Sequence, residues 1–363
     1  MNITKGRIPA LLLVSALSLV ALMGCASNGT QNGATNTGDV TASKDATKTM
    51  SLDLVKEWVG SGHAQVITFA AKEDGCKNCH DGMTFSETGG GFQPRMTSPA
   101  IDASAPAGAE PGSESPRDFV VATDCRACHT GAGAAIADRG AVDQIPSITT
   151  AEGGLGAVCM ACHNGWHPAG KNADGELTAP HKSVQTDMLF GVNTVDPGAE
   201  STATQGDMES PHLKVDNTCV GCHLAGKDGP SHTFRVTSFT GCEAKDCHDT
   251  DMSQGIVAKE DYDGDGTKEK ADVEIEGLSA TLKTAIEAKS GTFVSKSGQV
   301  VFAGKTTPDQ ATYAAAYNYF FVQKDGSSGV HNMPFTVDLL SRSIRAVGGK
   351  AGSGSAGSTT TTP

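Results

Sequence analysis

The sequence predicts a mainly α-helical chain with extensive loops, little regular secondary structure and almost no sheet. Two observations favour this class. The 363 residues include 44 glycines and only 5% aromatic residues, which is little apolar material for a core of this size. Ten of the eleven cysteines form five pairs, each followed at once by a histidine. A chain of this composition needs more than its own side chains to fill its interior.

The five pairs share one pattern, in which two cysteines stand a short loop apart and a histidine follows the second. Four copies read C-x-x-C-H, and the fifth has four residues between its cysteines. The paired cysteines, in chain order, are Cys76, Cys79, Cys125, Cys128, Cys159, Cys162, Cys219, Cys222, Cys242 and Cys247. The histidines that follow them are His80, His129, His163, His223 and His248.

C-x-x-C-H is the attachment signal for c-type haem. Two thiols at this spacing can each form a thioether with one vinyl group of the same porphyrin, and the next histidine then binds iron from the proximal side. Cysteine pairs also bind zinc, but zinc ribbons do not require a histidine directly after every second cysteine. The pattern therefore predicts five covalently bound haem c groups, with the chain wrapped around a row of them and much of the core supplied by porphyrin.

Six further histidines are candidates for the sixth iron ligand. The predicted distal ligands are His63, His181, His212, His232 and His331. The remaining one, His167, follows His163 by only four residues and is badly placed to cross to the other face of that haem. It could instead reach a neighbouring haem or a propionate. Methionine is the competing sixth ligand in cytochromes of this kind.

The N-terminus has the features of a secretion signal over residues 1–24. Lys5 and Arg7 precede an apolar stretch that is too short for a convincing membrane span. The stretch ends in Leu-Met-Gly-Cys25, which resembles the lipobox of bacterial lipoproteins, where the cysteine becomes lipidated. An ordinary signal peptide followed by a stray cysteine is the alternative. No aspartate stands at the second mature position, which favours sorting to the outer membrane.

Composition divides the rest of the chain. Residues 25–50 predict a lipidated Cys25 and a flexible polar tether, residues 51–347 one continuous haem-packed domain, and residues 348–363 a disordered tail. Removing the signal leaves 26 basic against 41 acidic residues, a formal charge of −15, because two of the 28 basic residues lie in it. This charge argues against nucleic acid as a partner.

An acidic loop follows the last haem motif. Asp261, Asp263 and Asp265 alternate before Gly266, which matches the start of an EF-hand-type calcium loop. The candidate calcium ligands are Asp261, Asp263, Asp265, Thr267, Glu269 and Asp272. No helix is evident just before the loop, so it is not a true EF-hand. A solvated acidic turn without a cation is the alternative.

Three helices are predicted near the C-terminus. Apolar residues recur at helical spacing over residues 275–286. Thr307 and Pro308 are expected to start a second helix over residues 309–322, and the third spans residues 335–345. The second helix carries four aromatic side chains, which are expected to pack on haem and on neighbouring helices.

The haem motifs, with the aromatic helix, the Gly-Val-His331-Asn loop and the Leu-Leu helix after it, resemble the multihaem c-type cytochromes of extracellular electron transfer in metal-respiring bacteria. The resemblance covers nearly all of residues 51–347. It implies a row of closely spaced, low-potential haems that passes electrons between other redox proteins, including cytochromes and a porin–cytochrome conduit. It also implies a lipid-anchored protein of the outer membrane with no residue that is catalytic in the acid–base sense.

Two alternatives come from other functional classes. Pentahaem reductases of nitrite or sulfite also carry five haems, but their catalytic haem has lysine in place of the proximal histidine. All five motifs here end in histidine, so that signature is absent. A cytochrome filament, in which a distal histidine comes from the next subunit, is the other alternative, and the sixth spare histidine leaves room for it.

Overall fold

The computed structural model describes residues 44–90, 119–170, 177–198, 208–227, 229–243, 247–248, 251–304 and 308–352. The predicted signal peptide, Cys25 and most of the expected tether and tail lie outside these residues, so the predicted boundaries remain predictions. Helix α1, Lys44–Val59, begins within the segment expected to be a tether. Residues 44–50 contain neither glycine nor proline, so nothing in them interrupts a helix.

Four of the five cysteine–histidine motifs form or join short helices. Helices α5 (Cys125–His129) and α9 (Cys219–His223) each contain a whole motif, α3 (Lys77–His80) begins directly after Cys76, and α7 (Ala157–Met160) ends within a fourth motif. In the first motif the His80 amide donates to the Cys76 carbonyl at 3.0 Å. One helical turn therefore places the two cysteines and the histidine on one face, since residues three and four apart are neighbours.

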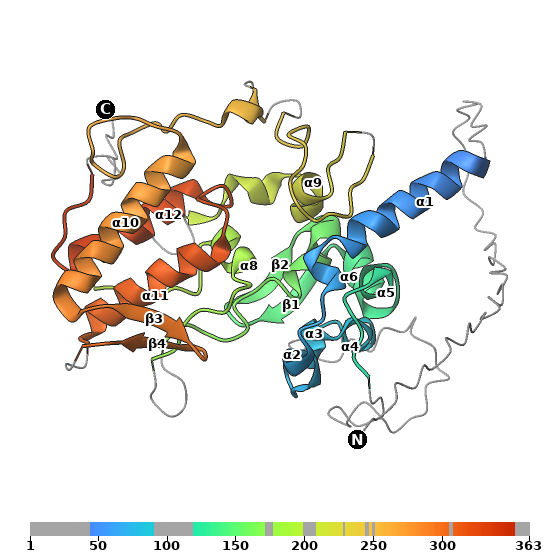
Figure 1. Cartoon of the computed structure of the whole chain (residues 1–363), viewed down its shortest axis with the longest axis horizontal. Helices are drawn as coiled ribbons and strands as arrows, with labels where there is room; N and C mark the ends of the chain where they lie inside the picture. Colours follow the sequence, from blue (N-terminus) through green and yellow to red (C-terminus); the bar gives the residue numbers. More distant parts are fainter. Residues whose placement is uncertain are drawn as a thin grey trace, which may run out of the picture. The chain divides into compact units, whose positions relative to one another are not determined.

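Other short elements connect these turns (Figure 1). The α-helices are α2 (Thr68–Lys72), α4 (Gly82–Thr88), α6 (Gly131–Arg139) and α8 (Gln185–Phe190). The 3-10 helices are η1 (Gly62–Ala64), η2 (Gly154–Gly156), η4 (Pro211–Lys214) and η5 (Met252–Gln254).

Sheet is confined, within the described residues, to two antiparallel hairpins. Strand β1 (Ala141–Ile145) pairs with β2 (Ile148–Glu152), with Val142 opposite Ala151. Strand β3 (Phe293–Lys296) pairs with β4 (Gln299–Phe302). The predicted class, mainly α-helical with extensive loops and little sheet, is confirmed.

Three longer helices pack together at the C-terminal end (Figure 1). They are α10 (Ala271–Ser290), α11 (Gln310–Asp325) and α12 (Met333–Ala346), and they confirm the three predicted helices. The expected start of the second was wrong. Asp309 caps α11 by accepting from the Thr312 amide at 2.8 Å, and Pro308 precedes the cap. Aspartate is a stronger N-cap residue than threonine, so the helix begins after Asp309 and not after Thr307.

This C-terminal bundle has an apolar core of its own. Leu278, Leu282 and Leu339 are fully buried. Among the aromatic residues of α11, Tyr313, Tyr317 and Phe321 are buried with them, whereas we expected much of the core to be porphyrin. A second buried cluster, with Phe85, Ile136, Val142 and Met160 among its members, packs against cysteines of the second, third and fourth motifs.

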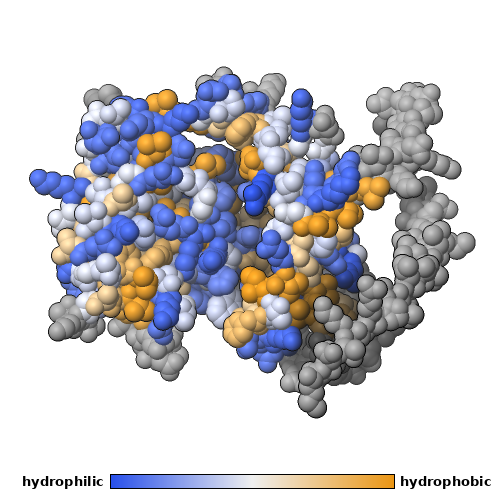
Figure 2. Space-filling view, viewed as in Figure 1, coloured by the Kyte–Doolittle hydropathy of each residue, from blue (hydrophilic) through white to orange (hydrophobic). Residues whose placement is uncertain are grey.

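The surface carries apolar side chains at the N-terminal end of the described chain. On the face shown in Figure 2 they gather over α1 and α2. They include Leu52, Val55, Val59, Ile67 and Phe69. No helix in the described part of the chain is both long and apolar enough to cross a lipid bilayer.

The bundle core generates a stability prediction. Leu339→Ala is expected to lower the free energy of unfolding by about 2–5 kcal/mol, because the truncation loses buried contacts and leaves a cavity. Urea unfolding followed by far-UV circular dichroism measures the change. Val273→Ala, at an exposed position of α10, is the control and should change it by less than about 0.5 kcal/mol. Equal effects of the two variants would contradict a self-packed bundle.

Candidate haem sites

The histidine of each motif faces a different one of the five predicted distal histidines. The ring-centroid distances are 6.2 Å for His80–His181, 6.3 Å for His129–His232, 6.1 Å for His163–His63, 6.2 Å for His223–His331 and 6.2 Å for His248–His212. Two metal–nitrogen bonds of about 2.0 Å and two ring radii of roughly 1.2 Å add to ~6.4 Å. Every pair is therefore spaced to hold one iron between its two rings.

These pairs join segments that are far apart in the sequence. His331, in the loop between α11 and α12, faces His223 at the end of α9. His63, in η1, precedes all five motifs and yet faces His163 of the third. Nearness in the chain therefore does not decide which distal histidine belongs to which motif.

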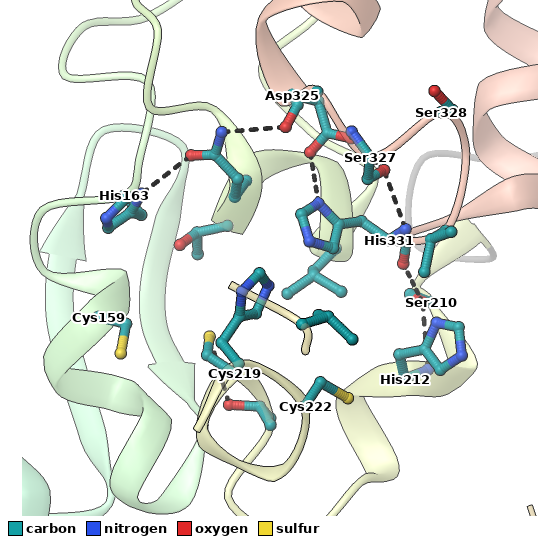
Figure 3. A pocket seen from close by; sticks show the side chains of 18 of the residues that line it. Cys159, His163, Ser210, His212, Cys219, Cys222, Asp325, Ser327, Ser328 and His331 are labelled. Carbon is teal, nitrogen blue, oxygen red and sulfur yellow. Dashed lines mark hydrogen bonds and ion pairs between the residues drawn. The ribbon is translucent and has the colours of Figure 1, made fainter. Parts of the chain in front are cut away.

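Four of the five pairs line one cavity of about 2230 Å³. Nine of the ten motif cysteines also line it, and its wall includes the apolar residues Phe85, Val236, Phe239, Ile256 and Val257. In Figure 3, Cys159 and His163 lie on one side of this cavity and His331 and His212 on the other, with Cys219 and Cys222 between them. Thiols, facing imidazoles and apolar walls fit a series of flat apolar macrocycles. The His129–His232 pair and Cys125 are not among the residues that line this cavity.

Cysteines of different motifs lie against one another. The Cys79 thiol neighbours that of Cys162 within hydrogen-bonding reach, and the Cys159 thiol neighbours that of Cys219 in the same way. Cys222 in turn lies close enough to Cys242 and Cys247 to interact electrostatically. The first motif therefore contacts the third, the third contacts the fourth, and the fourth lies close to the fifth. Cys128 of the second motif lies near the third.

Several ring nitrogens are oriented by hydrogen bonds. His163 Nδ1 lies 3.2 Å from Gln185 Oε1, and His223 Nδ1 lies 3.1 Å from the Phe234 carbonyl oxygen. His181 Nδ1 lies 2.6 Å from Ser183 Oγ, whose own proton goes to the Asn164 carbonyl. When Nδ1 donates in this way, Nε2 is left unprotonated and free to bind a metal.

The fourth pair has a charged partner. His331 Nδ1 donates to Asp325 Oδ1 at 2.6 Å, and the Asp325 side chain is only 1% exposed. Figure 3 shows this contact beside Ser327, whose hydroxyl donates to the other oxygen of the same carboxylate. Burial acts to lower the pKa of His331, but the hydrogen bond and charge of Asp325 raise it above its ordinary value.

At seven of the other paired rings burial favours the neutral imidazole. It lowers the pKa of His63 to about 4, with a further contribution from His163. It also lowers the pKa of His181 to about 4, with His80 the next contributor. The same cause lowers the pKa values of His80, His163, His212, His223 and His232. The neutral ring is the form that binds metal, so burial favours the form that a metal site needs.

His167 has a different setting. Its Nδ1 lies 3.2 Å from the Pro168 carbonyl oxygen, and its ring lies 5.6 Å from that of Trp166. In the described part of the chain its ring is paired with none of the five proximal histidines. It therefore stays outside the set of facing pairs.

The acidic loop brings its first carboxylates together. Asp261, Asp263 and Asp265 offer oxygens within 4.8 Å of one another, and so do Asp263, Glu269 and Glu274. The expected ligand Asp272 belongs to neither group; it stands in the first turn of α10 and lines the large cavity. Because α10 begins at Ala271, the fully buried Glu274 is the residue that turns back to the loop.

Glu274 organises this loop. Its carboxylate accepts from the amides of Tyr262 at 2.8 Å, Asp263 at 3.2 Å and Glu269 at 3.0 Å. Oxygen Oε2 of Glu269 is buried and has no hydrogen-bond partner among the described residues. Thr267, another expected ligand, is exposed, and its amide donates to Asp265 at 2.7 Å.

Sequence reasoning did not identify the residues that orient the ligands. Gln185, Ser183 and Phe234 carry no local signal, because each acts on a ring that the fold brings to it. Asp325 has a weak local signal in the sequence, since a carboxylate six residues before a predicted ligand can fold back onto that ligand. Glu274 also had one, as an acidic residue on a helix beside the loop.

Comparison with known proteins gives one structural likeness. No family model matches the chain, and no curated protein matches it. Among solved structures it is similar to the outer cell wall cytochrome OcwA, at 20% sequence identity and a TM-score of 0.44. The match covers 80% of this chain and 49% of that one, so the chain spans about half of that protein's length.

The ring pairing generates a spectroscopic prediction. In the haem-loaded protein, His181→Ala is expected to remove the ligand opposite His80 and to leave one of five irons five-coordinate. Electron paramagnetic resonance of the oxidised protein should then gain a high-spin signal equal to one haem per chain. His167→Ala is the matched control and should keep the low-spin spectrum. A high-spin signal from His167→Ala alone would show that the pairing is wrong.

Proposed function

We propose that this chain is a five-haem c-type cytochrome that transfers electrons along its haems. The observation that carries the proposal is the set of five facing histidine pairs, each 6.1–6.3 Å apart and each containing the histidine of one motif. A zinc ribbon would gather three or four cysteine or histidine ligands around one metal, whereas in the described residues such groups of three contain only carboxylates. Here the facing partner of each motif is a histidine from outside the motifs.

Bound haem supplies reversible one-electron chemistry, and the protein sets its ligands, burial and spacing. A histidine on each face fills both axial positions of an iron. The chain then has no open coordination position at which a substrate could bind. This favours an electron carrier over a reductase of nitrite or sulfite.

The cysteine neighbours support a continuous path. Thioether bonds anchor the porphyrin edges at these cysteines, so contact between Cys79 and Cys162, and between Cys159 and Cys219, brings neighbouring porphyrin edges close together. The path would run through the first, third, fourth and fifth haems. The second haem would join it beside the third.

Phe234 lies where three of the sites meet. Its ring is 4.2 Å from that of His63 and 5.8 Å from that of His232, and its carbonyl accepts from His223. Ligands of the second, third and fourth haems thus contact one residue. This arrangement supports the branch of the second haem at the third.

The cellular setting is part of the proposal. The lipobox-like Cys25 and the polar residues after it support a lipid-anchored protein of the outer membrane, exchanging electrons with other redox proteins or with a porin–cytochrome conduit. Covalent haem attachment outside the cytoplasm fits this setting. A filament would require a distal histidine from the next subunit, whereas all five pairs here form within one chain.

The test of the function combines haem content, spin state and turnover. We expect five haems per chain by pyridine haemochrome assay, low-spin signals only, and rapid oxidation of the reduced protein by a redox-protein or soluble metal-complex acceptor. Sustained turnover with nitrite or sulfite is not expected, because no iron has a free position. A stoichiometric high-spin haem together with such turnover would replace the carrier with a reductase. Fewer than five haems would contradict the assignment itself.

We also propose that the acidic loop binds one calcium ion. Two clusters of three carboxylate residues, which share Asp263, support this proposal, because calcium takes six to eight oxygen ligands. The pKa of Glu269 is raised, first by desolvation and then by the surrounding carboxylates, and a cation would relieve that repulsion.

Isothermal titration with Ca²⁺ of the chelator-treated protein tests this site. We expect one binding event that Asp263→Asn weakens by at least tenfold, because Asp263 is common to both carboxylate groups. Asp272→Asn is the matched control and should bind as the unchanged protein does. Absence of heat in the unchanged protein would leave the loop as a solvated acidic turn.

A further inference from the structure

The histidine ligands differ in the charge of their hydrogen-bond partners. His163 bonds an amide oxygen, His181 a hydroxyl and His223 a peptide carbonyl, all of which are neutral. His331 bonds the carboxylate of Asp325 at 2.6 Å. Among the paired histidines in the described part of the chain, His331 is the one whose ring is bonded to a carboxylate.

The carboxylate is held in place from both sides. Its Oδ1 accepts from His331, and its Oδ2 accepts from the hydroxyl and the amide of Ser327. The side chain is 1% exposed, so water does not screen its charge. Asp325 is therefore a fixed, buried negative charge one hydrogen bond away from a predicted iron ligand.

Its place in the fold is unfavourable for stability alone. Asp325 is the last residue of α11, and a negative charge at the C-terminus of a helix is opposed by the helix dipole. Burial of a carboxylate adds a desolvation cost. A residue at such a position needs a compensating partner, and His331 is the partner that the geometry provides.

We propose that Asp325 is a positioning residue that lowers the reduction potential of the haem site formed by Cys219, Cys222, His223 and His331. A carboxylate that accepts the Nδ1 proton raises the basicity of the ring, which makes Nε2 a stronger ligand. Ferric iron carries one more positive charge than ferrous iron, so a stronger donor and a nearby negative charge both favour the oxidised state. The inference rests on the proposed function, since it requires haem at this site.

A second hydrogen bond at this turn helps to design the test. Gln185 accepts from His163 Nδ1 and donates from Nε2 to the Asp325 backbone carbonyl at 3.1 Å. Substituting the Asp325 side chain leaves that carbonyl in place. The connection to the third site is thereby kept, while the charge at the fourth site is removed.

The experiment is a redox titration of the five-haem protein followed by electron paramagnetic resonance. Asp325→Asn, which keeps the shape and an acceptor oxygen, is expected to shift the reduction equilibrium of one haem about tenfold toward the reduced state, which is ~59 mV for a one-electron couple. The low-spin signal of the same haem should also move. That signal is expected to be the one that His331→Ala abolishes.

Asp338→Asn is the matched control. Asp338 lines the same cavity but is paired with Arg342 at 2.7 Å, so the variant removes one charge from the cavity wall without touching a ligand ring. It should shift every haem by less than threefold. If it matches Asp325→Asn, or if Asp325→Asn moves no haem by threefold, the proposal is overturned.

Haem content separates this failure from failure of the proposed function. If the unsubstituted protein does not contain five haems, the cytochrome assignment is wrong. If it contains five haems and Asp325→Asn leaves every reduction potential in place, only the role of Asp325 is wrong. If Asp325→Asn does not retain its haems, Asp325→Glu and Asp325→Gln replace it, since these two differ in charge and not in shape. The Gln variant should then have one haem at least threefold easier to reduce than the Glu variant, and equal potentials would overturn the proposal.

Discussion

Much of this chain's organisation follows from one distance, the separation of two imidazole rings that can hold an iron between them. Five ring pairs meet it within 0.2 Å of one another, from 6.1 to 6.3 Å. Four of the pairs tie a helical turn of a motif to a loop or 3-10 helix elsewhere in the chain, and the fifth joins His248 to the 3-10 helix η4. Since metal binding contributes directly to folding free energy, such connections can order a chain that has few long helices and few strands. The abundance of loops around the motifs is a consequence of that construction.

The environment of the rings serves the same requirement. A ring must be neutral and must present one particular nitrogen. Burial favours neutrality, and the lowered pKa values of His63 and His181 reflect it. Hydrogen bonds from Nδ1 to Gln185, Ser183 or the Phe234 carbonyl select the nitrogen. Asp325 departs from this pattern because it adds charge, which is why its effect should appear in a potential and not only in stability.

Two kinds of interior coexist in the molecule. The bundle of α10, α11 and α12 buries its own leucine and aromatic side chains, so protein atoms fill its core. Its α11–α12 turn carries Asp325, Ser327 and His331 to the large cavity. The region of the motifs instead surrounds a cavity lined by thiols, imidazoles and apolar residues. The bundle therefore places His331 opposite the histidine of a motif much earlier in the chain.

The elements whose chemistry is local could be predicted from the order of the residues alone. Two cysteines and a histidine within one helical turn predict haem attachment, and spacing predicts the three C-terminal helices, because both depend on neighbours in the chain. Other features depend on how distant segments fold back, so only the structure revealed them. They are the bundle's own core, the helix at the end of the expected tether, and the presence of Glu274 instead of Asp272 among the clustered carboxylates. Ring pairing was also decided there. A distal histidine reaches its motif through space, and no spacing in the sequence records whether His331 faces His223 or His63 faces His163.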